Sequence, residues 1–360
     1  MHIARVAPAL RVQPDRRLWV LLGGVAVLLA AMAAGVLLGP ARISPGGLGA
    51  VLAHALGLAD LPEAFRRDAA VLGVIRAPRV LLAAIIGAGL GAAGAAMQGL
   101  FRNPLADPGL IGVSAGAALA AVAAIVFGAT LFGAAAGVLG LWMLPLAAFI
   151  GGLAATLLMA RLGSVGGVTG VATLLLAGVA VNALAGALTG LLIFTADDRQ
   201  VRDITFWTLG SLAGARWEQV PVVAALVGLP TLGLIALARP LDALLLGEAE
   251  AFHLGHRVEA VKRVAVTLAA VAVAAGVAFT GLIGFVGLVV PHLLRLGFGS
   301  GHRLVLPGSA LLGGALLVLA DLAARSLAAP AELPVGVVTA LIGAPFFLWL
   351  LRRRAAGASP

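Results

Sequence analysis

The sequence predicts an all-α, polytopic membrane protein in which about ten transmembrane helices form a single domain over residues 1–360. Apolar residues make up 62% of the chain and charged residues only 11%, against roughly 25% in an ordinary soluble domain. The apolar residues also fall into long stretches without Asp, Glu, Lys or Arg, and a bilayer core about 30 Å thick needs about 20 such residues per helix. The composition therefore excludes a soluble enzyme, a disordered protein and an acidic or basic scaffold.

The first five spans follow from the uncharged stretches of the N-terminal half. The stretch 108–160 is long enough for two helices, and the region from Gly133 to Pro145 is the expected break because glycine and proline interrupt helices. Spans 1 to 5 are expected at 18–41, at 80–101, in the two parts of 108–160, and within 162–196, at about 171–194.

The other five spans come from the C-terminal half. The stretch 264–294 is too short for two full spans, so a turn near Gly281, Gly284 and Gly287 should leave a short eighth span. Spans 6 to 10 are expected at 219–238, in the two parts of 264–294, at 304–320 and at 333–351.

Basic residues set the expected orientation. A basic arm over 1–17 precedes span 1, and Arg352, Arg353 and Arg354 follow span 10. By the positive-inside rule both termini are cytoplasmic, which requires an even number of spans. Span 1 is too long for the apolar region of a signal peptide, so we expect it to be retained. The apolar run 48–58 in the outer loop 42–79 is too short to span and should lie on the surface.

Several kinds of chemistry are excluded by single residues. The chain has no cysteine, and its only lysine, Lys262, follows Val261, so a phosphate-binding P-loop is impossible and ATP hydrolysis cannot occur here by that route. No paired carboxylates, nucleophile–base pair or metal cluster is evident, so we expect no enzyme activity and no cofactor or metal in this chain. The basic residues are dispersed, which argues against nucleic-acid binding.

The span centres lack the ionisable groups that an ion-coupled transporter normally uses. Asn182 is the main polar exception, and Asp321 lies near a helix end where it can pair with Arg325 at i,i+4. We therefore expect an external motor on the cytoplasmic side. Its contact should be the mixed-charge segment 239–263, in which Gly247 and Gly255 bracket a short helical piece; an ordinary solvated loop is the alternative.

Small residues are dense in the run GAGLGAAGAAMQG at 87–99, which should let helix backbones approach closely. The longer stretch 76–120 that contains this run resembles the FecCD/BtuC-type permeases, the membrane subunits of type II ABC importers for ferric siderophores, haem and cobalamin. Three further motifs resemble the same family in the same order: GEAEAFHLG at 247–255, TGLIGFVGLVVPHLLRL at 280–296, and the segment 321–351.

The resemblance implies partners and symmetry. The chain would form a homodimer with the transport pathway at its interface, in a bacterial inner membrane, with two ATPase subunits that bind ATP and Mg inside and a periplasmic binding protein outside. Spans 2–5 and 7–10 would form an inverted repeat, of which GLIG at 109–112 and 281–284 is a faint trace. ATP hydrolysis would occur on the separate subunit.

The resemblance also assigns residues. Arg76, Arg79 and Arg325 would receive acidic groups of the binding protein; lipid-phosphate anchoring or local ion pairs are the alternatives. The ATPase-coupling residues would be Glu248, Glu250, Ala251, Leu254 and Gly255.

The cargo is expected to be haem, because the segment 99–119 and the ADD at 196–198 look most like the haem-importing branch, with a ferric siderophore second and cobalamin third. Span 5 would line the pathway, with Asn182 and Thr189 as its polar points. His253 and His256 would share one face of a helix and are candidates for a haem relay, although two solvated loop histidines are the alternative.

Overall fold

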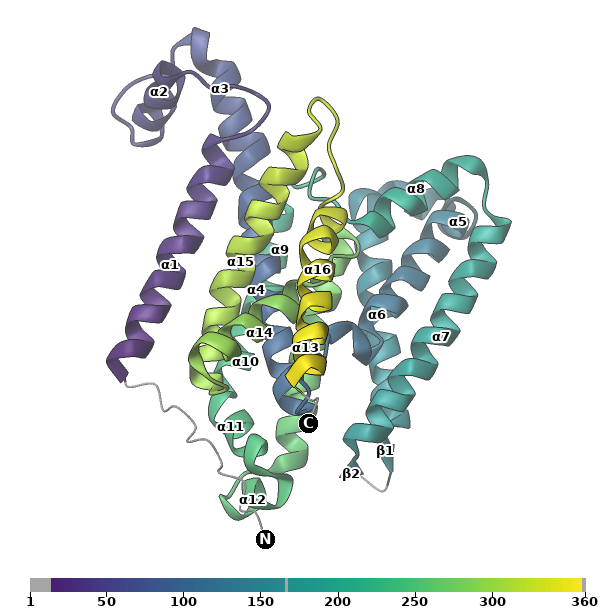
Figure 1. The fold of residues 1–360 in the computed structure, drawn as a ribbon. Coiled ribbons are helices and arrows are strands. Elements are labelled where there is room, and N and C mark those ends of the chain that lie inside the picture. Colours follow the sequence, from purple (N-terminus) through teal and green to yellow (C-terminus); the bar gives the residue numbers. More distant parts are fainter. Residues whose placement is uncertain (1–13, 166–167, 358–360) are drawn as a thin grey trace.

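The computed structural model describes residues 14–165 and 168–357, which form a bundle of helices with one very short hairpin (Figure 1). Seven helices are long and apolar enough to cross a membrane, and three more apolar helices are shorter. These ten segments follow the ten predicted spans in order. Their bounds are α1 Pro14–Leu37, α4 Ala77–Leu100, α5 Val113–Leu139, α6 Met143–Leu162, α7 Val171–Thr195, α9 to α10 Gln219–Ala236, α13 Val258–Thr280, α14 Val286–Phe298, α15 His302–Leu327 and α16 Val335–Gly357.

The remaining elements connect these helices. Two predicted breaks are confirmed: a 3-10 turn at Gly140–Trp142 (η4) separates α5 from α6, and the chain turns between α13 and α14 through Gly281 and Phe285, which both have positive φ. The other connecting elements are α2 Pro45–Ala55, η1 Glu63–Phe65, α3 Arg66–Ala70, η2 Val71–Arg76, η3 Pro108–Ile111, β1 Ser164–Val165, β2 Val168–Thr169, α8 Asp198–Leu209, α11 Ala238–Leu246 and α12 Glu248–His253; within the sixth span, η5 Ala224–Gly228 joins α9 Gln219–Val223 to α10 Leu229–Ala236.

Two connections differ from the sequence prediction. The second span is the end of one helical stretch of 38 residues, Glu63–Leu100, of which the sequence assigned the first part to a loop. The charged residues in that part ended the predicted span, but charged side chains do not interrupt a helix, and Arg76 is bonded to carbonyl oxygens at the end of α1. The helix α8 was also not predicted, although Asp197 and Gln200 form a capping box at its start.

Glycines on α4 allow it to pack directly against its neighbours. A Cβ on Gly87, Gly91 or Gly94 would collide with a backbone carbonyl of α15 or α14, the partners being Gly313, Ser309 and Gly287. The close approach predicted for 87–99 is therefore confirmed, and α4 is the buried centre of the bundle.

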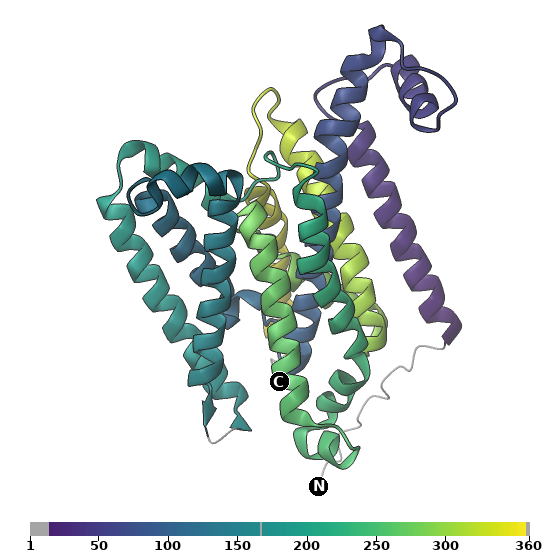
Figure 2. The same cartoon turned by 180° about the vertical axis from the view of Figure 1, so that it is seen from behind.

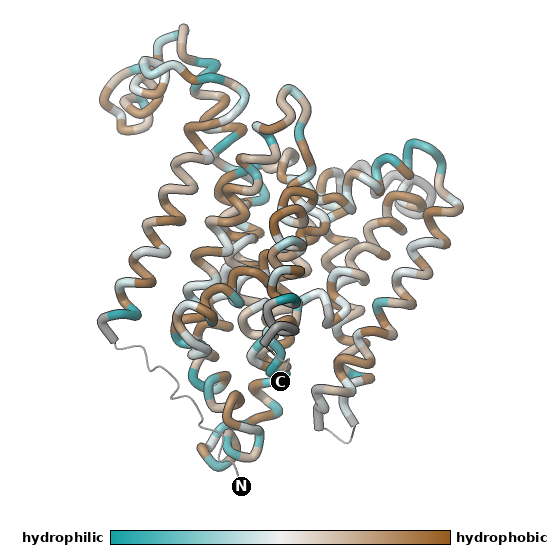
Figure 3. Tube along the Cα trace, in the orientation of Figure 1, coloured by the Kyte–Doolittle hydropathy of each residue, from teal (hydrophilic) through white to brown (hydrophobic). Residues whose placement is uncertain are grey.

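The bundle has two polar ends. The hairpin β1–β2 and the short helix α12 lie at one end, here called the α12 end, and α2, α3 and α8 lie at the other, here called the α8 end (Figures 1 and 2). Apolar residues fill the middle of the bundle, while hydrophilic residues gather at both ends (Figure 3). This distribution is typical of a protein that spans a membrane.

Candidate functional site

The short helix α12 stands at the tip of the α12 end and is bounded by two glycines with positive φ. Gly247 has φ 144° before the helix and Gly255 has φ 85° after it, so both turns favour glycine. The prediction that Gly247 and Gly255 bound a short helix is confirmed. Ala251 is completely buried against the bundle, whereas Phe252 and Leu254 are 69% and 61% exposed. Two large apolar side chains therefore face outward at the tip of the molecule.

Lys262, in the second turn of α13, anchors α12 to the bundle. Its side chain is 2% exposed, and its Nζ lies 2.6 Å from Glu248 Oε2 and 2.9 Å from Glu259 Oε1. A buried ammonium is costly without a partner, so the only lysine of the chain fixes the start of α12 on α13. This role was not predictable from the sequence, because Glu248 and Lys262 are separated by the turn at Gly255.

A second polar network joins four helices beside α12. His302, completely buried at the start of α15, has its Nδ1 3.0 Å from Asp242 Oδ1 on α11, and its backbone N–H donates to the same oxygen at 2.6 Å. Arg295 on α14 donates from Nη2 to the carbonyl oxygen of Ala95 at 2.9 Å and from Nε to Gln98 Oε1 at 3.3 Å, both on α4.

Asp242 is the member of this network that lies outside the membrane-spanning helices. Burial acts to raise the pKa of its carboxyl, but the hydrogen bonds from His302 outweigh burial, so the pKa lies below its ordinary value. The carboxylate form is thus favoured, and it ties α11 to α15. His302, Gln98 and Arg295 were not identified from the sequence. The one available signal was the position of His302 directly after a glycine-rich segment.

The α8 end contains the three arginines predicted to dock a binding protein, and the structure buries all of them. Arg76, Arg79 and Arg325 are 2%, 5% and 4% exposed, which corrects the expectation that they are surface charges. Arg79 donates from Nε to both carboxylate oxygens of Asp321 at 2.9 and 3.0 Å, and its Nη1 lies 2.9 Å from Glu332 Oε2. The local ion pairs left open by the sequence are present, and the docking role stays a prediction.

The other two arginines hold the end of α1. Arg76 Nη1 donates to the carbonyl oxygens of Val36 and Leu37 at 2.9 Å each, and Arg325 Nη2 donates to the carbonyl oxygen of Gly35. These carbonyls belong to the last turn of α1, where a helix has no internal donors left. The predicted i,i+4 pair of Arg325 with Asp321 is confirmed, with 3.6 Å between Nε and Oδ2.

The helix α7 lies at the edge of the bundle and exposes a long apolar surface (Figure 1). Its exposed large side chains are Leu176, Val179, Leu184, Leu188, Leu191, Ile193 and Phe194. Asn182 is half-buried and donates from Nδ2 to the carbonyl oxygen of Gly109 at 3.4 Å, and Thr189 donates to Ala185 within the helix. Thr189 is therefore bonded within its own helix, whereas Asn182 has one such contact and its buried Oδ1 has no hydrogen-bond partner among the described residues.

The histidine pair does not have the predicted geometry. The helix α12 ends at His253, and the chain then turns at Gly255 before it reaches His256. The two imidazoles are therefore not on one helix face, which corrects that expectation. Among the described residues, no group of three or more His, Asp or Glu is placed to hold a metal ion.

Comparisons with known proteins agree with these features. Residues 25–353 match the FecCD transport family. The chain is 45% identical over 282 residues to the hemin transport system permease protein HmuU of Yersinia pestis, covering 78% of this chain and 82% of that one. It is 47% identical over 284 residues to the cobalamin import system permease protein BtuC of Halobacterium salinarum, covering 79% of this chain and 74% of that one.

A solved structure is similar over nearly the whole length. It is described as an inward-facing conformation of a metal-chelate type ABC transporter, with a TM-score of 0.78 and 31% sequence identity. The match covers 93% of this chain and 99% of that one. The fold of the multi-pass membrane bundle is thus shared with a transporter of known structure.

Proposed function

This chain belongs to the FecCD transport family, and on that premise we propose that it is the membrane-spanning subunit of an ATP-driven importer in a bacterial inner membrane. The observation that carries the proposal is the short helix α12, which is bounded by glycines, anchored by an ion pair to the buried Lys262, and exposes Phe252 and Leu254 at one tip. An exposed apolar pair on a rigidly held helix is suited to fit a groove on another subunit.

The α12 end faces the cytoplasm in this proposal. Two ATPase subunits, which bind ATP and Mg, grip α12 there, and their closure on ATP displaces it. Because Glu248 at the start of α12 is bonded to Lys262, the displacement passes directly to α13. The segment 239–263 therefore acts as a lever between the ATPase and the spans, which alternate between outward and inward access. This chain itself needs no cofactor.

The topology follows from this orientation. All ten apolar helices cross the membrane, α14 as a short span, and both termini lie in the cytoplasm. Helices α4 to α7 and α13 to α16 form the two halves of an inverted repeat, since α4 begins at the α8 end and α13 at the α12 end (Figure 1).

Two copies of the chain associate and form the pathway between them. The apolar face of α7 supports this arrangement, because a large exposed apolar surface at the bundle edge suits a partner or a weakly held cargo. The Thr189 hydroxyl is bonded within α7 and Asn182 Oδ1 is buried, so the exposed wall that α7 gives to the pathway is mainly apolar.

A periplasmic binding protein docks at the α8 end. Arg79 takes part through Glu332, whose side chain is 42% exposed and bonded to that guanidinium. An acidic group of the arriving protein replaces this carboxylate, while Arg76 and Arg325 keep α1 in place beneath it.

Haem is the proposed cargo, with a ferric siderophore and cobalamin as alternatives. The likeness to HmuU supports haem, and the similar likeness to BtuC supports cobalamin, so identity alone does not decide between them. The resemblance of residues 99–119 to the haem-importing branch is the reason for placing haem first. His253 and His256 are separate sites in this proposal, and either could offer iron one imidazole at the cytoplasmic exit.

The test is reconstitution in proteoliposomes with the cognate ATPase and binding protein. Uptake of haem, a ferric siderophore and cobalamin is compared with and without ATP. Haem uptake that requires both ATP and the binding protein is the expected result. Uptake of another cargo under the same requirements would change the cargo and keep the mechanism. Uptake without ATP would overturn the importer proposal in favour of an ion-coupled transporter.

A further inference from the structure

The helices α6 and α13 lie side by side on the side of the bundle away from α16 (Figure 2). An apolar furrow runs between them. It consists of two adjoining cavities of about 310 and 440 Å³. The two cavities share the residues Leu157, Ala160, Val266 and Thr267. The first lies at the α12 end, and the second continues inward as far as Ile150 and Val271.

The length of the furrow matches one leaflet of a bilayer. From Arg161 back to Ile150 the helix α6 spans roughly 16 Å, and from Arg263 to Val271 the helix α13 spans about 12 Å, at about 1.5 Å per residue. One leaflet of hydrocarbon is about 15 Å thick. The second cavity is lined by aliphatic side chains apart from Thr156 and Thr267, and Thr156 bonds to Gly152 of its own helix.

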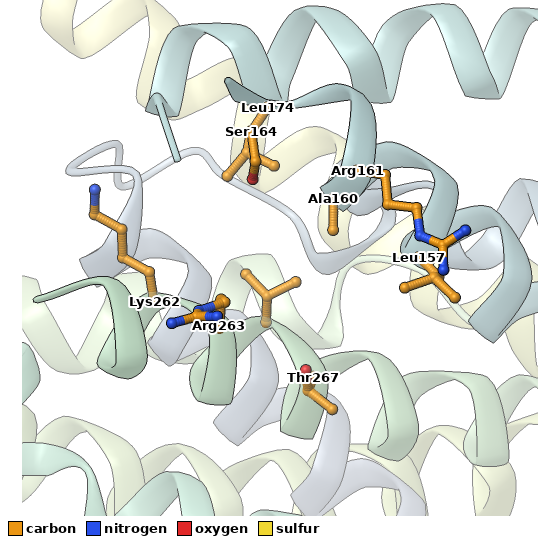
Figure 4. Close-up of a pocket in the computed structure, with 9 residues that line it drawn as sticks. Leu157, Ala160, Arg161, Ser164, Leu174, Lys262, Arg263 and Thr267 are labelled. Atoms are coloured by element: carbon orange, nitrogen blue, oxygen red, sulfur yellow. The ribbon is translucent and has the colours of Figure 1, made fainter. Parts of the chain in front are cut away.

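The end of the furrow is basic. Figure 4 shows Arg161 from α6 and Arg263 from α13 on opposite walls of the first cavity, to which Ser164 of the hairpin strand β1 also contributes. Both arginine side chains are exposed and can reorient at the rim. Neither guanidinium forms an ion pair within the part of the chain that the structure describes, whereas the neighbouring Lys262 is already bonded to two carboxylates.

We propose that this furrow binds one anionic phospholipid of the cytoplasmic leaflet. The phosphate group lies between Arg161 and Arg263, and an acyl chain occupies the apolar furrow toward Ile150. Basic pockets between membrane helices on the cytoplasmic side suit anionic headgroups, and arginine binds phosphate oxygens in a bidentate manner. A free phosphate would use only the rim, so the furrow itself favours a lipid.

The bound lipid contacts α13 at the residue that holds the coupling helix. The aliphatic stem of Lys262 lines the same cavity, while its ammonium fixes Glu248 of α12. A lipid packed there stiffens the first turns of α13. This inference depends on the proposed orientation, with the α12 end in the cytoplasm, but not on the cargo or on ATP hydrolysis.

Native mass spectrometry of the detergent-purified full chain tests the binding. Phosphatidylglycerol and phosphatidylcholine are titrated separately, and retained lipid adducts are counted. We expect phosphatidylglycerol to be retained preferentially and Arg161→Gln plus Arg263→Gln to weaken its retention about 30-fold, since two basic contacts are lost. Ala160→Phe, which fills the shared part of the furrow, should weaken retention of the lipid and leave both charges in place.

The matched control is Arg199→Gln plus Arg202→Gln, which removes two exposed arginines from α8 at the other end and should leave retention unchanged. Millimolar inorganic phosphate or glycerol phosphate should not displace the lipid; displacement would show that the site holds a free phosphate instead. Equal retention by wild type and the Arg161, Arg263 double variant would overturn the proposal. None of these readouts requires transport, so they can fail or succeed independently of the proposed importer function.

Discussion

Both ends of the bundle contain buried charged side chains. At the α8 end they join long helices to each other, whereas at the α12 end they hold a short outer helix. At the α8 end, Asp321 and Arg79 are 1% and 6% exposed at their side chains and join two of the longest helices, α15 and α4. At the α12 end, Lys262 is equally buried, but its partners Glu248 and Glu259 are 44% and 28% exposed. The first pair lies inside the bundle, and the second holds a short outer helix against it.

This difference indicates different roles for similar ion pairs. Breaking a fully buried pair leaves a charge without water or partner, which costs stability. Breaking a half-exposed pair lets water reach the carboxylates, so the cost falls and the main loss is the position of α12. The α8 end should therefore govern the stability of the fold, and the α12 end should govern the transmission of movement.

The largest effect on stability is expected from Asp321→Asn. The change leaves Arg79 and Arg325 buried with one carboxylate fewer, so the free energy of unfolding should fall by about 3 to 5 kcal/mol. An SDS titration of the purified protein in mixed micelles measures this. Glu332→Gln, which removes the half-exposed partner of Arg79, should cost no more than about 1 kcal/mol. If both variants lost the same free energy of unfolding, the buried carboxylate of Asp321 would be no more important for stability than the half-exposed one of Glu332.

A smaller loss of stability, with a localised structural effect, is expected from Lys262→Met. Because water can reach Glu248 and Glu259, unfolding should become easier by only about 1 to 2 kcal/mol. Hydrogen–deuterium exchange should become faster at 248–256 and stay unchanged in α4 and α15. The control is Arg239→Met, an exposed position on α11. Unchanged hydrogen–deuterium exchange at α12 would show that Lys262 does not anchor this helix.

Asp242 should give the α12 end a measurable pH dependence. Burial acts to raise its pKa, but the hydrogen bonds from His302 outweigh burial, so the net pKa lies below its ordinary value. A carboxyl with a lowered folded pKa stabilises the protein above its unfolded pKa, about 3.9, and this stability is lost as the pH falls through the folded pKa.

Asp242→Asn should therefore lower the melting temperature at neutral pH and flatten its decline between about pH 5 and about pH 3. Melting temperatures in detergent across this range provide the measurement. A variant whose acid decline is as steep as that of wild type would show that another carboxyl governs it.

The smallest effect on stability is expected from Phe252→Ala plus Leu254→Ala. Both side chains are exposed, so unfolding should change by less than about 0.5 kcal/mol, while binding of the ATPase subunit should weaken. Co-purification with the ATPase measures the second effect. Leu56→Ala plus Leu58→Ala, at similarly exposed positions near α2, is the matched control. If both double variants retain the ATPase equally, α12 is not the contact.

The sequence predicted the apolar helices well, because uncharged stretches and glycine turns are local signals. It predicted the turns that precede α6 and α14, and it predicted that Gly247 and Gly255 bound α12. It did not predict the helix over 63–76, since each charge was treated as the end of a span. Arg79 and Asp321 are 242 residues apart in the sequence, and they come into contact only in the folded protein.

The site was predicted less completely than the fold for the same reason. Lys262 was singled out only because it excludes a P-loop, and His302 was not noticed. The family resemblance identified the segment 247–255 but not its anchor, which lies beyond the turn. Pairwise contacts between segments leave no periodic trace in a single sequence, whereas helix length and glycine turns do.

The coupling role of Lys262 is tested by ATP-driven uptake per folded protomer of Lys262→Met, in proteoliposomes with the ATPase and binding protein. Folded protomers are counted by size-exclusion chromatography before reconstitution. We expect at least a roughly tenfold loss of uptake with the ATPase still bound through Phe252 and Leu254, because about 1.4 kcal/mol of lost coupling corresponds to a factor of ten. Uptake equal to that of wild type would show that α12 transmits movement without Lys262, and the coupling role of this residue would be wrong.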